Sequence, residues 1–184
     1  MPSPVGHSLT GYLLSKSGHQ GNIRKSWKRI LLFIVVANLP DLDFLPGLLM
    51  GSPNRFHHQF VHSLGFACIL GFLFGAYFKM MRGEKFLPNA SVFSCIYASH
   101  IIMDFFTVDT RYPFGVPLFW PLTNRYFISP ISIFLDIHRA ASTDKFFASL
   151  FGAHNLIASL IEICFFLLIL GIIALWKRTR LQLA

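Results

Sequence analysis

The stretch LIASLIEICFFLLILGIIALW, residues 156–176, decides the fold of this chain. Glu162 is its only charged residue. An α-helix rises about 1.5 Å per residue, so a segment of this length crosses the roughly 30 Å hydrocarbon core of a bilayer. Residues 156–176 therefore predict a C-terminal transmembrane helix.

Three further apolar segments precede it. The first, Ile30–Pro40, resumes after a polar interruption as Phe44–Met50. The second is Ser63–Met81 and the third is Ala90–Val108. Residues typical of turns between helices separate them: Pro53, Asn54, Gly83 and Pro88. Together the segments indicate about four long transmembrane helices.

Two other parts of the chain complete the predicted fold. Val5–Ser15 is apolar but too short to cross a bilayer, so we expect a half-length helix there. Residues 109–155 alternate aromatic and polar residues with several prolines, which favours a folded cap over a disordered loop. We therefore expect an all-α fold, a polytopic membrane helical bundle in one membrane-embedded domain spanning residues 1–184.

The composition agrees with a membrane location. Hydrophobic residues make up 54% of the chain and charged residues only 13%, about half the share typical of soluble domains. The net charge of +8 by itself suggests a nucleic-acid partner, but the basic residues cluster beside apolar segments, at Lys16–Arg29, Lys79–Lys85 and Lys177–Arg180. Such clusters mark cytoplasmic loops. We therefore expect a lipid bilayer as the partner, no nucleic acid, and residues 109–155 on the outer side.

Ionisable side chains inside membrane segments are costly and are therefore functional candidates. Here they gather at the predicted outer ends of the helices. P-D-L-D follows the first segment, H-H-Q-F-V-H-S leads into the second, S-H-I-I-M-D lies in the third, and V-G-H lies near the start. The candidate residues are His7, Asp41, Asp43, His57, His58, His62, His100 and Asp104.

The spacing of these residues suits a divalent metal ion. In H-x-x-x-D, His100 and Asp104 share one helix face and can reach the same ion. Pro40 helps to end the first helix, so that the two carboxylates after it can converge. Imidazole nitrogens and carboxylate oxygens suit zinc, manganese or iron. We expect His57 in the loop before the second long helix and His62 in the first turn of that helix.

Each motif also has a simpler interpretation. P-D-L-D alone fits a turn that stops a helix, and H-x-x-x-D alone fits a hydrogen bond between packed helices. The combination favours a metal ion, because several buried polar groups at one depth would otherwise lack partners.

Other polar residues have less specific interpretations. Glu162 shares a helix face with His154, and the two residues could contribute a further ligand, but we favour a pairing of Glu162 inside the bundle. The outer segment holds residues that we expect to be solvated: Asp109, Asp136, His138 and Asp144. It also holds arginines that suit either an anionic head group or phosphate, or interfacial anchoring: Arg111, Arg125 and Arg139. The cysteines lie in apolar segments without CxxC spacing and are expected to be buried: Cys68, Cys95 and Cys164.

Five motifs occur in a fixed order within residues 5–122: V-G-H-S-L-T-G, L-P-D-L-D, H-H-Q-F-V-H-S-L, A-S-H-I-I-M-D-F-F-T and G-V-P-L-F-W-P. This order resembles the YdjM-like membrane-bound metal-dependent hydrolases, a family also described as LexA-binding and inner-membrane-associated. The resemblance implies a bacterial inner-membrane protein whose metal-site core spans residues 5–122. It implies metal ligands at His7, Asp41, Asp43, His57, His62, His100 and Asp104.

The chain departs from this family pattern at two positions. His58 stands where the family commonly has Arg, and Val61 stands where it commonly has Thr. LexA binding is implied by the family name alone. The resemblance ends at residue 122, so residues from 123 onward carry no expectation from it.

We interpret the cluster as the centre of a metal-dependent hydrolase that holds one or two divalent ions, zinc first. Such an ion lowers the pKa of water. Asp41 and His58 are the candidate catalytic residues. A site at the periplasmic face of the membrane favours an amphiphilic substrate, such as a lipid that carries a phosphoester. The alternatives are a metal-ion or small-solute transporter and a non-catalytic membrane module with a structural metal.

Overall fold

The computed structural model describes residues 1–17 and 27–182. The described residues form helices and loops, with two isolated β-bridges and no named strand, which confirms the all-α prediction. In chain order the helices are α1 (Pro4–Ser17), α2 (Trp27–Asn38), η2 (Leu39–Asp43), α3 (Phe44–Leu49), η3 (Pro53–Phe56), η4 (Phe60–His62), α4 (Leu64–Arg82), α5 (Phe86–Phe105), α6 (Thr143–Ser149) and α7 (Ala153–Gln182).

Four segments of the described chain are long and apolar enough to cross a membrane. They are Trp27–Leu49, Leu64–Arg82, Phe86–Phe105 and Ala153–Trp176. The first consists of α2, η2 and α3, and the others are α4, α5 and most of α7. These are the four segments that the sequence predicts. Helix α1 has 14 residues and is therefore about 21 Å long, which makes it the predicted half-length helix.

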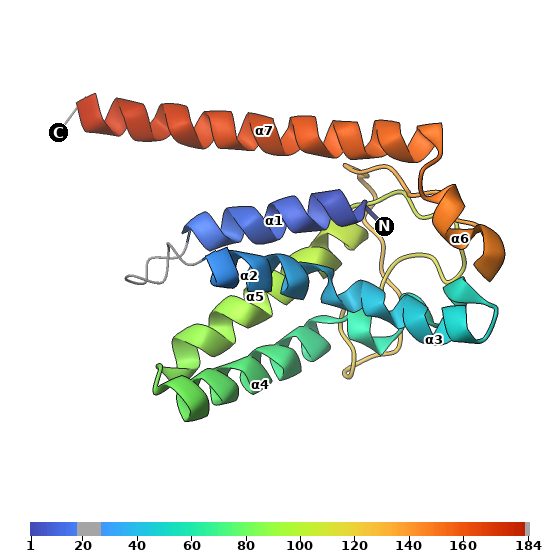
Figure 1. Cartoon of the computed structure of the whole chain (residues 1–184), viewed down its shortest axis with the longest axis horizontal. Helices are drawn as coiled ribbons and strands as arrows, with labels where there is room; N and C mark the ends of the chain where they lie inside the picture. Colours follow the sequence, from blue (N-terminus) through green and yellow to red (C-terminus); the bar gives the residue numbers. More distant parts are fainter. Residues whose placement is uncertain (18–26, 183–184) are drawn as a thin grey trace.

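The helices pack around α5. Helices α4 and α5 form an antiparallel hairpin, α2 packs against α5, and α1 packs against α2, α5 and α7 (Figure 1). The apolar core between α2, α4 and α5 contains Phe33, Val36, Phe93, Ile96 and Tyr97. Helix α7 lies at the edge of the bundle, and many of its apolar side chains are exposed on the surface that a bilayer covers.

Two glycines allow α4 and α5 to approach closely. A Cβ atom on Gly71 would lie 2.5 Å from the backbone oxygen of Ala90, and one on Gly75 would lie 3.0 Å from the backbone oxygen of Phe86. Larger side chains at these positions would push the helices apart. The pair is spaced as G-x-x-x-G, a spacing that brings helices together in membranes.

The basic clusters and the outer segment lie at opposite ends of the bundle. The start of α2, the turn between α4 and α5, and the end of α7 lie at one end, whereas residues 109–155 lie at the other (Figure 1). Arg29 at the start of α2 pairs with Glu84 in the α4–α5 turn at 3.4 Å and donates to Asn89 Oδ1 at 2.8 Å. The basic residues Arg24 and Lys25 lie outside the described residues.

Some local predictions are wrong. Pro88 lies inside the first turn of α5, where a proline costs no intrahelical hydrogen bond, and does not separate two helices. Helix α5 ends at Phe105, before Val108. The cysteines predicted to be buried lie on the molecular surface, because the apolar helices that carry them turn those faces outward: Cys68, Cys95 and Cys164.

Candidate metal centre

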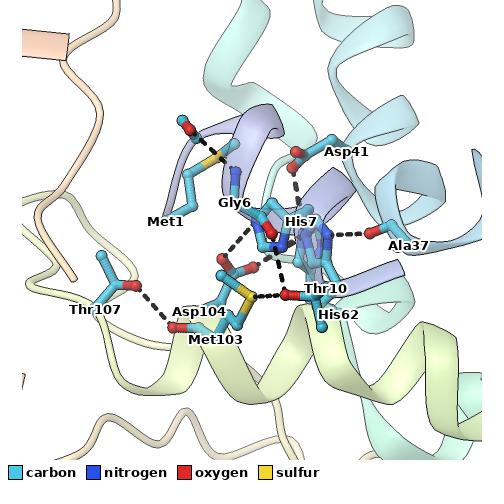
Figure 2. A network of polar contacts seen from close by, with 12 residues as sticks. Met1, Gly6, His7, Thr10, Ala37, Asp41, His62, Met103, Asp104 and Thr107 are labelled. Carbon is cyan, nitrogen blue, oxygen red and sulfur yellow. Dashed lines mark hydrogen bonds and ion pairs between the residues drawn. The ribbon is translucent and has the colours of Figure 1, made fainter. Parts of the chain in front are cut away.

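The candidate His and Asp residues converge at the end of the bundle where residues 109–155 lie. His7 comes from α1, Asp41 from η2, His62 from η4, and Asp104 from α5, and Figure 2 shows their side chains close together. His57 and His58 come from the loop between η3 and η4, and His100 from α5. His7, His62 and His100 are each 0% exposed, so this is a buried site and not a surface patch.

The L-P-D-L-D motif turns the chain into this site. Pro40 has no backbone N–H to continue the hydrogen bonds of α2, and the next residues wind into the tighter helix η2. Asp41 and Asp43 then face different sets of partners, although both lie near His62. An Asp41 oxygen lies near the rings of His62 and His100, whereas Asp43 faces the loop that carries His57. The predicted helix end at Pro40 is confirmed.

The loop before α4 has an unusual backbone. His58 has a φ of 60°, a left-handed conformation that is uncommon for any residue other than glycine. Its backbone N–H donates to Asp43 Oδ2 at 3.2 Å. His62 lies in η4, one residue before the cap of α4, and not in the first turn of α4 as the sequence predicts. This loop therefore directs three imidazoles inward from irregular backbone.

Asp104 lies at the centre of the cluster. Its Oδ2 atom lies 3.3 Å from His100 Nε2, 3.6 Å from His62 Nε2 and 3.8 Å from His58 Nε2. Its Oδ1 atom lies 3.7 Å from His7 Nε2. Asp41 Oδ1 adds distances of 3.6 Å to His100 Nε2 and 3.8 Å to His62 Nε2.

These distances fit shared coordination better than hydrogen bonding. All six exceed the usual 2.7–3.2 Å of a hydrogen bond. Two donor atoms that each lie about 2.0–2.2 Å from one zinc ion are at most about 4.4 Å apart. Three groups have all their candidate donor atoms within 4.8 Å of one another: His57, His58 and His62; His7, Asp41 and His100; and His62, His100 and Asp104.

The cluster contains nearly all the buried side-chain polar atoms that lack a hydrogen-bond partner in the described residues. Outside it, only Asn38 Oδ1 and Arg139 Nη1 have none. Within it, the atoms that lack a hydrogen-bond partner include both carboxylate oxygens of Asp41 and of Asp104 and the Nε2 atoms of five histidines. Buried polar groups without partners are costly. A cation among them would remove that cost.

Hydrogen bonds at Nδ1 orient the rings of His100 and His57, and His62 contacts a carboxylate through its Nδ1 atom. His100 Nδ1 lies 2.8 Å from the backbone oxygen of Ala37, which accepts only, so Nδ1 carries the proton and Nε2 is free to bind an ion. His57 Nδ1 lies 3.0 Å from Asp43 Oδ1, and His62 Nδ1 lies 3.1 Å from Asp43 Oδ2. Asp43 therefore contacts the outer nitrogens of two imidazoles and belongs to none of the three groups.

The histidines before α4 differ in charge. Burial lowers the pKa of His57 and of His58 well below 6.5, and nearby cationic groups act in the same direction. Burial also disfavours charge on His62, but the carboxylates of Asp43 and Asp41 outweigh it and raise the pKa of His62 to about 9. His57 and His58 are thus neutral at neutral pH, the form that binds metal ions.

A cavity of about 70 Å³ lies beside the cluster, and the sequence does not predict all of the residues that line it. It is lined by His57 and His58 together with Asn54, Asp109, Arg111, Tyr112, Pro113 and Arg139. Asp109 was predicted to be solvated, but its side chain is 7% exposed and one of its oxygens lies 3.7 Å from His58 Nδ1. The available signal was its position five residues after Asp104, just beyond the end of α5.

The outer segment has one further buried acid. Asp136 was also predicted to be solvated, but it is 5% exposed and pairs with the amino group of Met1 at 3.2 Å. The surrounding chain covers it, which no local pattern predicts. His138, Asp144 and Arg125 are exposed, as expected for His138 and Asp144.

The two polar residues noted in the fourth transmembrane segment lie outside the cluster. Glu162 is 1% exposed and accepts hydrogen bonds from Ser3 and Gly6, so the predicted pairing inside the bundle is confirmed. His154 Nε2 lies 2.9 Å from the backbone oxygen of Asp136.

Comparison with known proteins gives one family. No curated protein and no solved structure matches the chain. The chain matches the YdjM inner membrane protein family over residues 1–180. This match is longer than the resemblance over residues 5–122 and includes residues 123–180, for which the motifs give no expectation. With four helices able to cross a membrane and a match over almost its whole length, the chain belongs to the YdjM inner membrane protein family.

Proposed function

We propose that this protein is a metal-dependent hydrolase of the inner membrane that acts on a phosphoester or an amphiphilic lipid. The observation that carries the proposal is the set of buried His and Asp atoms around Asp104 that have no hydrogen-bond partner. The family description gives a location and no reaction. The proposed activity therefore rests on the chemistry of the cluster.

The cluster suits one or two divalent ions. Imidazole nitrogens and carboxylate oxygens, with no cysteine in any of the three groups, favour zinc and also accept manganese or iron. Asp104 would help to hold such ions, because one of its oxygens faces His7 and the other faces His58, His62 and His100. We assign Asp43 a positioning role, since it contacts the outer nitrogens of His57 and His62.

Two side chains are placed to take part in hydrolysis. A divalent ion in the cluster supplies Lewis-acid activation of water near neutral pH. His58 belongs to the cluster and also lines the cavity, so it can contact a bound substrate and exchange a proton with it. Asp41 has two buried oxygens without donors, and one of them can accept a proton while the other faces an ion.

We place the site on the periplasmic side of the membrane. The support is the charge asymmetry of the bundle, because Arg29, Lys79, Arg82 and Lys85 lie at the end opposite the cluster. A C-terminal fusion to green fluorescent protein should fluoresce, and one to alkaline phosphatase should be inactive. The reverse pattern would place the cluster at the cytoplasmic face.

The activity is tested on the full chain purified in detergent. Its metal content is measured by mass spectrometry, and hydrolysis of phosphomonoesters, phosphodiesters and phospholipids is measured with and without a chelator. We expect chelator-sensitive turnover in the native chain and none in His100→Ala. His138→Ala is the matched control, because His138 is an exposed histidine outside the cluster. Bound metal without turnover of any ester would overturn the hydrolase proposal in favour of a structural metal.

A further inference from the structure

Arg139 is a buried cation that lacks a partner for part of its charge. The residue is 6% exposed, and its Nη1 atom is buried without a hydrogen-bond partner. Its Nε atom donates to Asn54 Oδ1 at 3.1 Å, and Asn54 is neutral. Among the described residues no carboxylate lies within the 4.0 Å of an ion pair with Arg139, although the charges of Asp136, Asp41 and Asp104 act on it from farther away. Because an unpaired buried charge is costly, the site is suited to an anion that the chain itself does not supply.

The guanidinium group is held beside the His–Asp cluster. It lies 5.0 Å from the ring centroid of Phe44, and Phe44 stacks on the ring of His57 at 4.1 Å. Arg139 and Arg111 line the same cavity as His57 and His58. The backbone oxygen of Arg139 also accepts a hydrogen bond from Arg111 Nη2. A group bound to Arg139 in this cavity is therefore next to the cluster.

The one carboxylate in the cavity wall does not neutralise these arginines. Asp109 accepts hydrogen bonds from the backbone N–H groups of Gly115 at 2.7 Å and of Arg111 at 3.1 Å. These backbone donors stabilise the charge of Asp109 in place. The cavity thus has two guanidinium groups against one carboxylate that is already hydrogen-bonded.

We propose that this cavity binds the phosphate group of the substrate, with Arg139 as its principal contact and Arg111 as a second. The inference rests on the proposed function and deepens it by naming the substrate class as a phosphoester. The planar guanidinium fork matches phosphate oxygens. The volume of about 70 Å³ is several times the roughly 10–15 Å³ that admits one water, so a small tetrahedral group fits.

The test measures the binding of radiolabelled inorganic phosphate to the full chain in detergent by equilibrium dialysis, at equal and measured metal content. Arg139→Gln should weaken phosphate binding about tenfold or more, since a charge-assisted contact is lost. Arg125→Gln is the matched control, because it removes the same charge from an exposed position of the same outer segment. It should change binding less than twofold. Equal affinities of the two variants would overturn the subsite.

Two further variants keep the test decisive where Arg139→Gln does not fold. Arg139→Lys keeps the charge but loses the fork, and Arg111→Gln removes the second cation. We expect both to weaken phosphate binding. Native affinity in both would overturn the proposal.

Competition identifies the source of the phosphate. Glycerol phosphate represents a soluble phosphoester, and phosphatidic acid in mixed micelles represents a lipid headgroup. The stronger competitor defines the source, and the failure of both to displace phosphate would contradict the subsite. Weaker phosphate binding in Arg139→Gln without ester hydrolysis by the native chain would retain the subsite and reject the hydrolase. Ester hydrolysis by the native chain, with unchanged phosphate binding in Arg139→Gln, would retain the hydrolase and reject the subsite.

Discussion

Helices α5 and α7 each bury a carboxylate in a membrane-spanning segment, but the two carboxylates have different surroundings. Glu162 on α7 accepts hydrogen bonds from the backbone N–H groups of Ser3 at 2.7 Å and Gly6 at 3.1 Å, and from the Ser3 hydroxyl. Asp104 on α5 has no hydrogen bond to either oxygen and faces imidazole nitrogens. The first carboxylate joins two helices, whereas the second is suited to a cation.

The two helices also differ in how tightly they are packed. Helix α5 is enclosed by α1, α2 and α4, and a Cβ atom on Gly71 of α4 would collide with it. Helix α7 packs chiefly against α1, and a Cβ atom on Gly171 would meet no atom within 4 Å. Helix α5, which carries His100 and Asp104, is thus enclosed by three helices, whereas α7 packs chiefly against one.

The largest expected effect is at Asp104. Asp104→Asn keeps the shape of the side chain but removes its negative charge, so we expect metal affinity to fall by more than about 100-fold. Chelator competition with metal analysis measures this. Glu162→Gln is the control and should retain the metal, because Glu162 lies outside the cluster. If Asp104→Asn kept its metal, the contrast between the two carboxylates would be wrong.

A smaller effect on the same measurement is expected at Asp43. Asp43→Asn weakens the contacts to His57 Nδ1 and His62 Nδ1, so we expect a loss of about 10- to 100-fold in metal affinity. The same chelator competition checks this. An effect as large as that of Asp104→Asn would make Asp43 a direct ligand instead of a positioning residue.

The free energy of unfolding should fall when Glu162 is substituted. Glu162→Gln replaces one acceptor oxygen with an amide donor that faces the N–H groups at the start of α1, and we expect a loss of about 1.5–3 kcal/mol in unfolding free energy. Thermal denaturation in detergent measures it. Unchanged stability would mean that the hydrogen bonds of Glu162 do not contribute to holding α7 in place.

The difference in packing predicts that alanine substitutions at two glycines change the stability of the protein in opposite directions. Gly71→Ala overpacks the contact between α4 and α5 and should destabilise the protein by about 1–3 kcal/mol. Gly171→Ala fills open space on α7 and should stabilise the helix by up to about 1 kcal/mol. The same thermal assay compares them. Equal shifts in both variants would contradict the difference in packing.

The sequence predicts the helices well, because length and hydropathy are local properties. The segment 156–176 and three others give the four membrane-spanning candidates, and Pro40 gives the end of α2. The prediction fails at Pro88, since a proline is equally compatible with the turn before a helix and with its first turn. It also fails for the cysteines, because an apolar segment does not reveal which face meets lipid.

The sequence predicts which residues belong to the candidate site but not how they are arranged. The cost of ionisable groups in a membrane identifies His100 and Asp104 from the sequence alone. The different position of Asp43, which contacts imidazoles from outside, depends on the irregular turn that gives His58 its φ of 60°. The burial of Asp109 and Arg139 depends on how residues 109–155 fold over the helix ends.

The sequence by itself thus determines a four-span helical membrane protein of the YdjM family with polar residues at one end. Helix length, apolar composition and charge asymmetry follow from short stretches of chain, so they can be read without contacts. Only the tertiary structure decides that the Glu162 carboxylate is satisfied and the Asp104 carboxylate is not. The physical reason is that Glu162 meets the N–H groups of Ser3 and Gly6, and Asp104 meets imidazoles from α1 and the loop before α4, only in the folded chain, because these residues are distant in sequence.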